Sequence, residues 1–403
     1  MGDDERGCRM DRTASEECIA RIMADRTGTR PEDWYCVYRA RHGMLAACEA
    51  IREVMGEGFV VTQLLTCCTA VDPILAAGLG PRYGEVHAAT ASLDPECLPL
   101  DSDVRAVVLQ HSYGLIDVDA SAKIADAAHE AGALVLEDCA HGVARMALGT
   151  DGAPLADVSF HSFGVEKMLH TQFGGAVWVN PNGAAPEVLR ALRERLSHLP
   201  VAGARLTLLA GTFIFWNRVF NHLPIPVARG LRKFLSTVGL FEPAVSDEER
   251  LGGVSHEPMR PSKAICDAVI EAFGRLDEDV AARIKAARTY SELLDGVPGV
   301  TLLASAAQSP YQPLLKYPVL VADAATSDAA CEACCAAGHY MTVWYRPELG
   351  PGVLDELAYH VPVDRSGIPV CDDMVQRILT LPTNQGAEGA RAVVDVLKGV
   401  VSS

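Results

Sequence analysis

Three residues whose side chains could share one reaction follow one another along the chain: Asp138, Ser162 and Lys167. The lysine ends the segment 157–167, which starts with the alternation of a strand and becomes polar in its middle. A Gly174-Gly175 turn then leads into a second apolar strand. A lysine between two buried strands loses its charge easily, as an amine that forms a Schiff base must. On this segment alone, a strand-end lysine that reaches solvent is an equally good interpretation.

An acid, a hydroxyl and a lysine at successive strand ends are the protein groups that pyridoxal 5'-phosphate (PLP) requires. The lysine forms the Schiff base, the acid holds the pyridine nitrogen protonated, and hydroxyls and amides bind the phosphate. Taken singly, Asp138 could be only a helix N-cap, and His141 only a satisfied histidine. The order of the three groups within one α/β unit favours the PLP interpretation.

A sheet is needed to bring these residues together, and the sequence predicts one. Residues 104–137 form a strand–helix–strand unit of the length that makes parallel sheet. Ligands of such sheets gather at the carboxyl ends of the strands, where we expect residues 111–113, 138–141 and 162–167. The predicted strands are 34–38, 59–65, 104–109, 133–137, 176–179, 316–321 and 339–345, and the predicted helices are 44–54, 70–77, 119–131, 263–294, 327–337 and 387–400.

Composition narrows the class of protein. The 403 residues are too many for one simple core, and a net charge of −17 argues against nucleic-acid binding. Residues 1–30 lack the apolar core of a secretory leader, so we expect the 13 scattered cysteines to be free thiols in a reducing cytoplasm. Cys331 and Cys334 lie in a helical Ala/Cys run without a second pair at zinc-site spacing, so we expect packing there and no metal site.

The block 138–175 resembles one known family. Asp138 with Ala140-His141, the spacing Ser162-Phe-x-x-x-Lys167 and the pair Gly174-Gly175 look like the DegT/StrS-type aminotransferases. These are PLP enzymes of fold type I that act mostly on nucleotide-linked keto-sugars. The resemblance runs from about residue 38 to residue 396. Its supporting matches lie at residues 104–141, 111–117, 258–260 and 379–382.

The resemblance implies an α/β fold, the PLP-dependent transferase fold type I, with a large mixed and mostly parallel sheet domain and a smaller C-terminal α/β domain. We expect a polar leader at residues 1–33 and a large PLP-binding domain at 34–260, with an insertion at about 201–250. The smaller domain would span residues 261–403 and start with a long linking helix. The resemblance also implies a homodimer with shared active sites.

The resemblance assigns a role to each residue of the block. Lys167 is the Schiff-base lysine and Asp138 the partner of the pyridine nitrogen. His141 lies near the cofactor's 3-hydroxyl, and Ser162 lies on its phosphate.

Three positions depart from the family. Arg41, His42 and Gly43 open the first helix, where the family usually has Ser/Thr-rich residues that bind phosphate; an arginine and helix amides can do the same. Cys67 stands where an aromatic residue often stacks on the pyridine, and it offers no π-face. Residues 255–257 replace the asparagine that the family contributes across the dimer, so that contact is lost or made by His256.

Residues 201–245 have no clear counterpart in the family. Their apolar run at 206–216 is too short to span a bilayer, and five basic residues against the single acid Glu242 give the segment a charge of +4. We expect this insertion to pack over the active site or on the partner subunit. The alternative is a basic amphipathic surface that touches a membrane or a lipid-linked substrate. Further along, Arg346 could bind a substrate carboxylate, although a surface cation is the preferred interpretation.

The predicted function is a PLP-dependent aminotransferase. It would move an amino group from an amino-acid donor, glutamate or glutamine by the resemblance, to a nucleotide-linked keto-sugar or a keto-cyclitol through a Lys167 aldimine. The freed Lys167 would move the proton as general base and acid. Two alternatives remain. A PLP-dependent sugar dehydratase of the same fold would replace the lysine by histidine. A non-catalytic scaffold or sensor would account for Cys67 and Arg41, yet it would not need Asp138 and Lys167.

Overall fold

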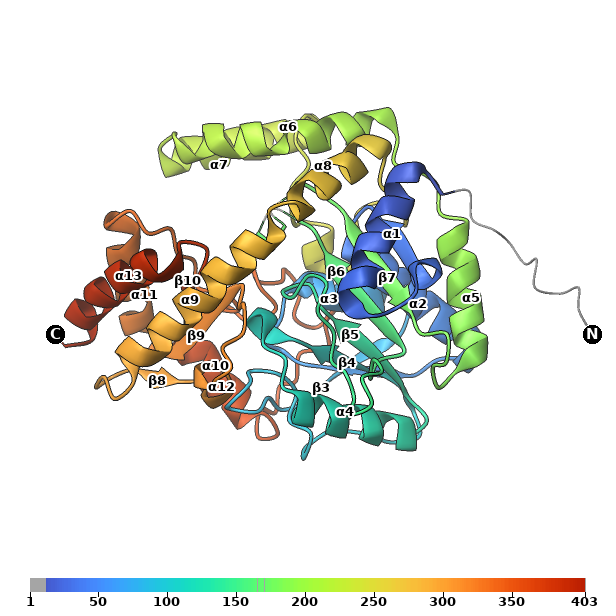
Figure 1. The fold of residues 1–403 in the computed structure, drawn as a ribbon, viewed down its shortest axis with the longest axis horizontal. Helices are drawn as coiled ribbons and strands as arrows, with labels where there is room; N and C mark the ends of the chain where they lie inside the picture. The colour runs from blue at the N-terminus through green and yellow to red at the C-terminus, as the bar shows by residue number, and fades with distance from the viewer. Residues whose placement is uncertain (1–11, 165, 170, 403) are drawn as a thin grey trace, which may run out of the picture.

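A seven-stranded sheet forms the centre of the larger part of the molecule (Figure 1). The structure is a computed structural model that describes residues 12–164, 166–169 and 171–402. The strand order is β1-β7-β6-β5-β4-β2-β3, in which β7 is antiparallel to both neighbours and the other pairs are parallel. The strands are β1 (Trp34–Val37), β2 (Phe59–Thr62), β3 (Gly80–Tyr83), β4 (Val104–Gln110), β5 (Leu134–Asp138), β6 (Val158–Ser162) and β7 (Gly175–Val179). The predicted mixed, mostly parallel sheet is confirmed.

Alternating side chains of this sheet enter two separate cores. Val107 and Leu109 of β4 pack with α4 (Val118–Glu130), whereas Ala106 and Val108 pack with α2 (Ala40–Met55) and α5 (Pro186–Ser197). Strands buried on both faces read as continuous apolar runs, which is why β4 and β5 are readily predicted. Strand β3 was not predicted, because Gly-Pro-Arg-Tyr has no apolar alternation. A third core joins α1 (Ala14–Thr27) to the antiparallel end of the sheet.

A smaller antiparallel sheet, β10-β9-β8, lies in the C-terminal part (Figure 1). Its strands are β8 (Thr301–Leu302), β9 (Lys316–Leu320) and β10 (Ile378–Pro382), accompanied by α3 (Cys68–Ala76) from the larger part in one shared core. The helices of this part are α9 (Leu276–Leu294), α10 (Ala304–Ala307), α11 (Ala324–Ala336), α12 (Pro369–Arg377) and α13 (Gly386–Val401).

Two predictions about this part are wrong. The single helix predicted at 263–294 is two helices, α8 (Lys263–Phe273) and α9, because the chain turns at Gly274 and the two buried faces serve different cores. The strand predicted at 339–345 is irregular, and Tyr345 has a φ of 66°. Met341 of that run is buried in the C-terminal core, and Trp344 and Tyr345 pack against His141 of the larger part instead of pairing in a sheet.

Backbone hydrogen bonds join the two parts directly. The N–H groups of Leu349 and Gly350 donate to the carbonyls of Leu64 and Thr66, at 3.0 and 2.8 Å. In return the N–H of Cys68, at the start of α3, donates to the carbonyl of Gly350 at 3.0 Å. The loop after β2 is therefore fixed to the C-terminal part at both sides of Cys67.

The insertion folds as a helical hairpin, named here the arm: α6 (Ala204–Asn221) and α7 (Ile225–Thr237), at the top of Figure 1. Its inner side forms a core with Phe173, directly before the Gly174-Gly175 pair. On its outer side, Leu208 is 67% exposed, and Phe215 and Phe234 are each 60% exposed. The arm thus packs beside the loop that carries Lys167, and its outer apolar side chains keep the membrane alternative open. Within the described residues no helix has the length and hydropathy needed to span a membrane.

All twelve cysteines among the described residues are free thiols, as predicted. Cys8 lies outside them. In α11, Cys334 is buried and the thiols of Cys331 and Cys335 donate to the carbonyl of Met341. Those contacts are the packing role that was expected of this cysteine run.

Candidate active site

The strand ends bring the predicted residues to one edge of the large sheet. Asp138 ends β5 and pairs in register with Gln110 of β4 and Phe160 of β6. Ser162 ends β6, and the loop that follows carries Lys167. A Cβ placed on Gly164 would lie 3.8 Å from both Ser162 Oγ and Lys167 Cγ, so the hydroxyl and the lysine stem flank the same small space.

Lys167 is a desolvated amine. Burial lowers its pKa, although Cys67, Asp138 and Glu166 favour the charged form. Its Nζ lies 5.4 Å from the centre of the Trp344 ring. Among the described residues, no hydrogen bond or ion pair within 4 Å engages this amine. A lysine with a lowered pKa and no competing partner is suited to attack a carbonyl or to take up a proton.

Asp138 is a half-buried carboxylate with one oxygen engaged. Oδ1 accepts the N–H of Ala140 at 2.9 Å. Burial raises the pKa of Asp138, and Lys167 and His111 offset part of that effect. Lys167 and Asp138 therefore act on each other electrostatically without forming an ion pair within 4 Å. Two opposite charges held apart in a buried site leave room for a group between them.

A second carboxylate supports Asp138 from behind. Glu137, fully buried, accepts hydrogen bonds from His111 at 2.8 Å, from the N–H of Ala147 at 2.6 Å and from the hydroxyl of Ser159. Burial would raise its pKa, but His111 and the hydrogen bonds from Ala147 and Ser159 together lower it. Sequence reasoning treated Glu137 only as the end of a strand. Its position before Asp138 fixes the direction of the neighbouring side chain, because successive residues of a strand face opposite sides.

His141 is a neutral imidazole in an aromatic setting. Nδ1 accepts the N–H of Tyr113 at 3.0 Å, and Nε2 lies 3.2 Å from the Tyr345 hydroxyl oxygen. Because Nδ1 accepts, the proton is on Nε2, which donates to Tyr345. Burial holds the pKa of His141 well below its ordinary value, and Lys167 lowers it further. The ring of Trp344 lies 5.1 Å from that of His141.

The sequence-based site did not include these two aromatic residues of the C-terminal part. The run Trp344-Tyr345-Arg346 was noticed for its arginine, which instead pairs with Asp328 and donates to the carbonyls of Ala324 and Gln376. Arg346 is thus paired within the C-terminal part and mostly buried, whereas the sequence favoured a surface cation. The two adjacent aromatic residues Trp344 and Tyr345 were the signal in the sequence that could have indicated a packing partner for His141.

Cys67 faces the same space from the loop after β2. Its Sγ lies 3.0 Å from the hydroxyl oxygen of Thr69. A hydrogen bond from the Cys68 thiol, the Thr69 hydroxyl and the charges of Lys167 and Arg41 lower the pKa of Cys67, against the effect of burial. A sulfur atom with thiolate character therefore stands where the family often has an aromatic ring.

The predicted phosphate residues at the start of α2 are engaged elsewhere. Arg41 pairs with Glu249 and donates to the carbonyl of Ala244. The His42 ring is fully buried; Nδ1 accepts the N–H of Met259 and Nε2 lies 3.3 Å from the carbonyl oxygen of Ser255. Gly43 allows α2 to approach β7, since a Cβ there would be 2.2 Å from Val177. The side chain of His42 is thus not available to a phosphate, and only the amides of this turn remain.

Arg39 and Arg41 are held by two acids of the segment after the arm. Arg39 pairs with Glu242 at 3.0 Å and with Glu249 at 3.4 Å, and Glu249 also pairs with Arg41. His256, considered as a replacement for the cross-dimer asparagine, donates instead to Glu242 at 2.8 Å. Burial would raise the pKa of Glu249, yet Arg41 and Arg39 outweigh it and hold this pKa below its ordinary value.

Glu249→Gln is expected to destabilise the protein by about 3 kcal/mol at neutral pH, because two buried guanidinium groups lose their shared counter-charge. A carboxylate whose pKa is lowered by folding stabilises above its unfolded pKa and loses that effect as pH falls. The difference in free energy of unfolding between wild type and variant should therefore persist at pH 7 and shrink below pH 4.5, the ordinary value. Urea unfolding at several pH values measures it. The exposed Glu257→Gln is the matched control; an equal loss there would contradict the assignment.

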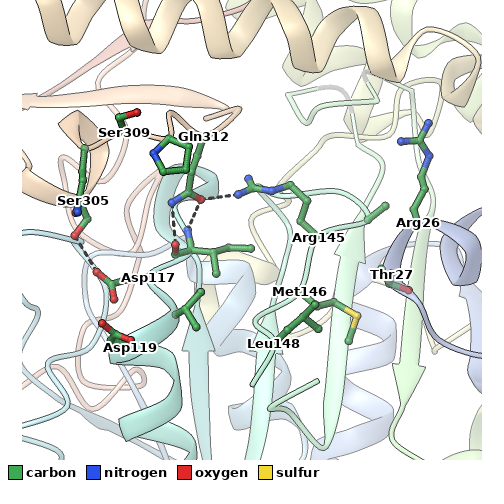
Figure 2. Close-up of a pocket in the computed structure, with 15 residues that line it drawn as sticks. Arg26, Thr27, Asp117, Asp119, Arg145, Met146, Leu148, Ser305, Ser309 and Gln312 are labelled. Carbon is green, nitrogen blue, oxygen red and sulfur yellow. Dashed lines mark hydrogen bonds between the residues drawn. The ribbon is translucent and has the colours of Figure 1, made fainter. Parts of the chain in front are cut away.

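A cavity lies apart from this cluster. It has a volume of about 600 Å³ and lies between α1, the start of α4, the loop 144–148 and the segment 305–312 (Figure 2). Arg145 spans its wall, donating to Gln312 Oε1 at 2.5 Å and to the carbonyl of Gly114 at 2.8 Å. Asp117 accepts the Ser305 hydroxyl at 2.9 Å. None of the eight predicted site residues lines this cavity.

Comparison with known proteins agrees with the resemblance. Residues 37–197 match the model of the DegT/DnrJ/EryC1/StrS aminotransferase family. The matched segment runs from the end of β1 through α5 and contains Asp138, Ser162 and Lys167. The resemblance is thereby confirmed for this segment, which matches the model of a family of aminotransferases. A comparison with curated protein sequences gave no match.

Several solved structures share the fold over nearly the whole chain. The aminotransferase TlmJ from Streptoalloteichus hindustanus is 21% identical with a TM-score of 0.68, and the match covers 98% of this chain and 92% of that one. DesI, solved in the presence of its TDP-sugar product, is 19% identical with a TM-score of 0.67, covering 98% and 86%. NtdA from Bacillus subtilis, with bound cofactor PMP, is 13% identical with a TM-score of 0.69, covering 98% and 79%. The predicted fold type I is confirmed; at these identities the likeness concerns the fold alone.

Proposed function

We propose, on the premise that residues 37–197 match the model of an aminotransferase family, that this protein is a PLP-dependent aminotransferase with Lys167 as the reactive lysine. One observation carries the proposal. A half-buried lysine after β6 and a half-buried carboxylate at the end of the neighbouring β5 act on each other's pKa without forming an ion pair within 4 Å. That arrangement stabilises neither group by itself, and it suits a cofactor that binds between them.

The residues present fit this cofactor at its reactive end. Lys167 would bond to its aldehyde carbon, the free oxygen of Asp138 would face its ring nitrogen, and His141 and the Trp344 ring would enclose the ring. Ser162 and the amides at the start of α2 would hold the phosphate. Arg41 contributes less than the sequence suggested, since Glu249 neutralises it. Cys67 would contact the ring face through sulfur in place of an aromatic side chain.

The chemistry of the chain's own residues follows from their environments. PLP, when bound, supplies the electron sink that withdraws electrons from the substrate α-carbon. The amine of Lys167, with its lowered pKa, would take the proton from the donor's α-carbon and deliver it to the former aldehyde carbon of the cofactor in the same half-reaction, with the reverse transfer in the second half-reaction. The charge of Lys167 favours the ionised form of Asp138, which would hold a proton on the ring nitrogen of the bound cofactor. Trp344 and Tyr345 cover His141 and keep water from the reacting atoms.

The substrates are proposed at two levels. The family and its structural neighbours support an amino-acid donor and a sugar-type keto acceptor. The finer proposal is glutamate or glutamine as donor and a nucleotide-linked keto-sugar or keto-cyclitol as acceptor, in a homodimer with shared sites; DesI was solved with a TDP-sugar product. Free thiols favour a reducing cytoplasm as the location.

Absorbance tests the proposed function. Purified protein supplied with PLP should show a visible band that amino donors bleach, and keto-acceptors should restore it. Screening donors first and acceptors second identifies both substrates. Protein that stays colourless with excess PLP would leave the scaffold or sensor alternative, whereas loss of a sugar hydroxyl without amination would indicate the dehydratase.

Cys67 is expected to react with iodoacetamide faster than the exposed Cys97, and to keep reacting as pH falls towards neutrality, because its lowered pKa supplies more thiolate. Bound PLP should protect it. Peptide mass spectrometry after timed alkylation, with and without PLP, gives both rates. Equal rates at the two cysteines, or no protection by PLP, would remove Cys67 from the site.

A further inference from the structure

A second lysine stands at the site from the C-terminal part. Lys316 begins β9, and its Nζ lies 5.5 Å from the centre of the Trp344 ring, the ring that also lies 5.4 Å from Lys167 Nζ. Trp344 in turn lies 5.1 Å from the ring of His141. Lys316 is half-buried, so its ammonium is close to the site and partly removed from water. Neither the sequence nor the proposed mechanism gives this lysine a task.

The charge of Lys316 has no bonded acid. Among the described residues, no carboxylate lies within 4 Å of its Nζ. The neighbouring cation Arg283 has its own partners, Asp279 at 2.6 Å and the hydroxyl of Thr383 at 2.8 Å. Burial and the repulsion of Arg283 lower the pKa of Lys316, while the exposed Glu166 acts in the opposite direction. A surface lysine would extend into water; this one is held over an indole ring.

A cation that is partly desolvated and has no counter-ion destabilises the folded protein, unless an anion binds there. A second cation of this part close to Trp344 in sequence, Arg346, is saturated by Asp328 and by two carbonyls. Lys316 is thus a cation of the C-terminal part that is available to bind a substrate reacting at Lys167. A single ammonium matches the single charge of a carboxylate, whereas a phosphate is better matched by a guanidinium fork or by several donors.

We propose that Lys316 binds a carboxylate of the amino-acid donor while the donor's amino group reacts at the Lys167 end of the site. The proposal rests on the proposed function and deepens it, since it makes the donor an anionic amino acid held across Trp344. Lys316 acts as a binding residue, and no proton or bond change is assigned to it. A phosphate of the acceptor is the other anion that this position could take, and the experiment separates the two.

The first experiment titrates PLP-loaded protein with donors and follows the loss of the visible band. Lys316→Met should raise the half-saturating concentration of L-glutamate roughly 10- to 100-fold, as expected when a charged hydrogen bond is lost. An aliphatic amine without a carboxylate should change less than about two-fold, within the range expected for an uninvolved contact. Lys316→Arg should recover much of the loss for L-glutamate. Met keeps the apolar stem of lysine over Trp344, so packing is retained.

A second readout does not depend on turnover. Lysine acetylation followed by peptide mass spectrometry should show Lys316 modified more slowly in the presence of glutarate, with the exposed Lys123 as internal control. Inorganic phosphate is tested in parallel. Protection by glutarate with a changed glutamate titration supports the proposal.

Three results would count against it. Protection by phosphate alone, with an unchanged glutamate titration, would assign the position to the acceptor. Normal bleaching of Lys316→Met and no protection by either anion would overturn the anion site and leave the aminotransferase proposal standing. Protection by glutarate in a protein that no donor bleaches would keep the anion site and reject the proposed function.

Discussion

Lys167→Ala is expected to abolish transamination, lowering the rate by at least about 10³-fold, because the variant loses both the nucleophile and the group that moves the proton. The visible band of PLP-loaded protein should disappear even when the cofactor is retained. Stopped-flow absorbance with the best donor measures the residual rate. Removal of a desolvated amine should not lower Tm, since the wild-type amine has no bonded partner among the described residues.

Two controls make this result specific. Lys167→Arg keeps the positive charge beside Asp138 but cannot attack the aldehyde at neutral pH, so it should be as inactive as Lys167→Ala. Added methylamine should restore part of the rate of Lys167→Ala by occupying the vacated space as an external base. A variant that retains more than about a tenth of the wild-type rate would show that another group moves the proton.

Asp138→Asn is expected to reduce the rate by roughly 10²- to 10³-fold while cofactor is still bound, because an amide cannot hold the ring nitrogen protonated. Single-turnover bleaching measures the rate, and equilibrium dialysis measures PLP.

The stability of the apoprotein should increase in Asp138→Asn, in contrast to the activity. A carboxyl whose pKa is raised by burial destabilises the fold as pH rises through its unfolded pKa, here 3.8. Asp138→Asn apoprotein should therefore have a higher Tm at neutral pH than wild type, and the gain should vanish near pH 3.8.

Because activity is expected to fall while the Tm of the apoprotein rises, Asp138→Asn distinguishes a catalytic role from a structural one. A residue that serves only as a helix or loop cap would lose stability on substitution, or lose nothing. Lower activity together with a more stable apoprotein is the result expected of a carboxylate retained for chemistry. Lower activity with a lower Tm would indicate that Asp138 acts mainly through the fold.

The sequence reveals the large sheet and its reactive edge because each is encoded locally. Buried parallel strands are continuous apolar runs, and the polar residues that follow them must meet where those strands end. Asp138, Ser162 and Lys167 were found in this way, from a single stretch of chain. Their order along the sequence is also their order across neighbouring strands.

The remainder depends on contacts between distant segments. The pairing of Arg39 and Arg41 with Glu242 and Glu249 spans about two hundred residues, so an arginine that looks available for phosphate is neutralised in the folded chain. The prediction that Trp344 lies in a strand is wrong because an apolar run indicates that its side chains are buried but does not indicate which segment they pack against. Lys316 likewise looked like the polar start of β9, and only the position of Trp344 relates it to Lys167.

The backbone hydrogen bonds of Leu349, Gly350 and Cys68 have a consequence for how molecules enter the site. Any rigid-body hinge that separates the two sheets must break all three, each with a net stabilisation of about 0.5–1.5 kcal/mol. Opening by rotamer changes of Trp344 and Tyr345 breaks none of them. Substrate exchange would then proceed on the timescale of side-chain motion, with the two halves of the molecule fixed as one frame.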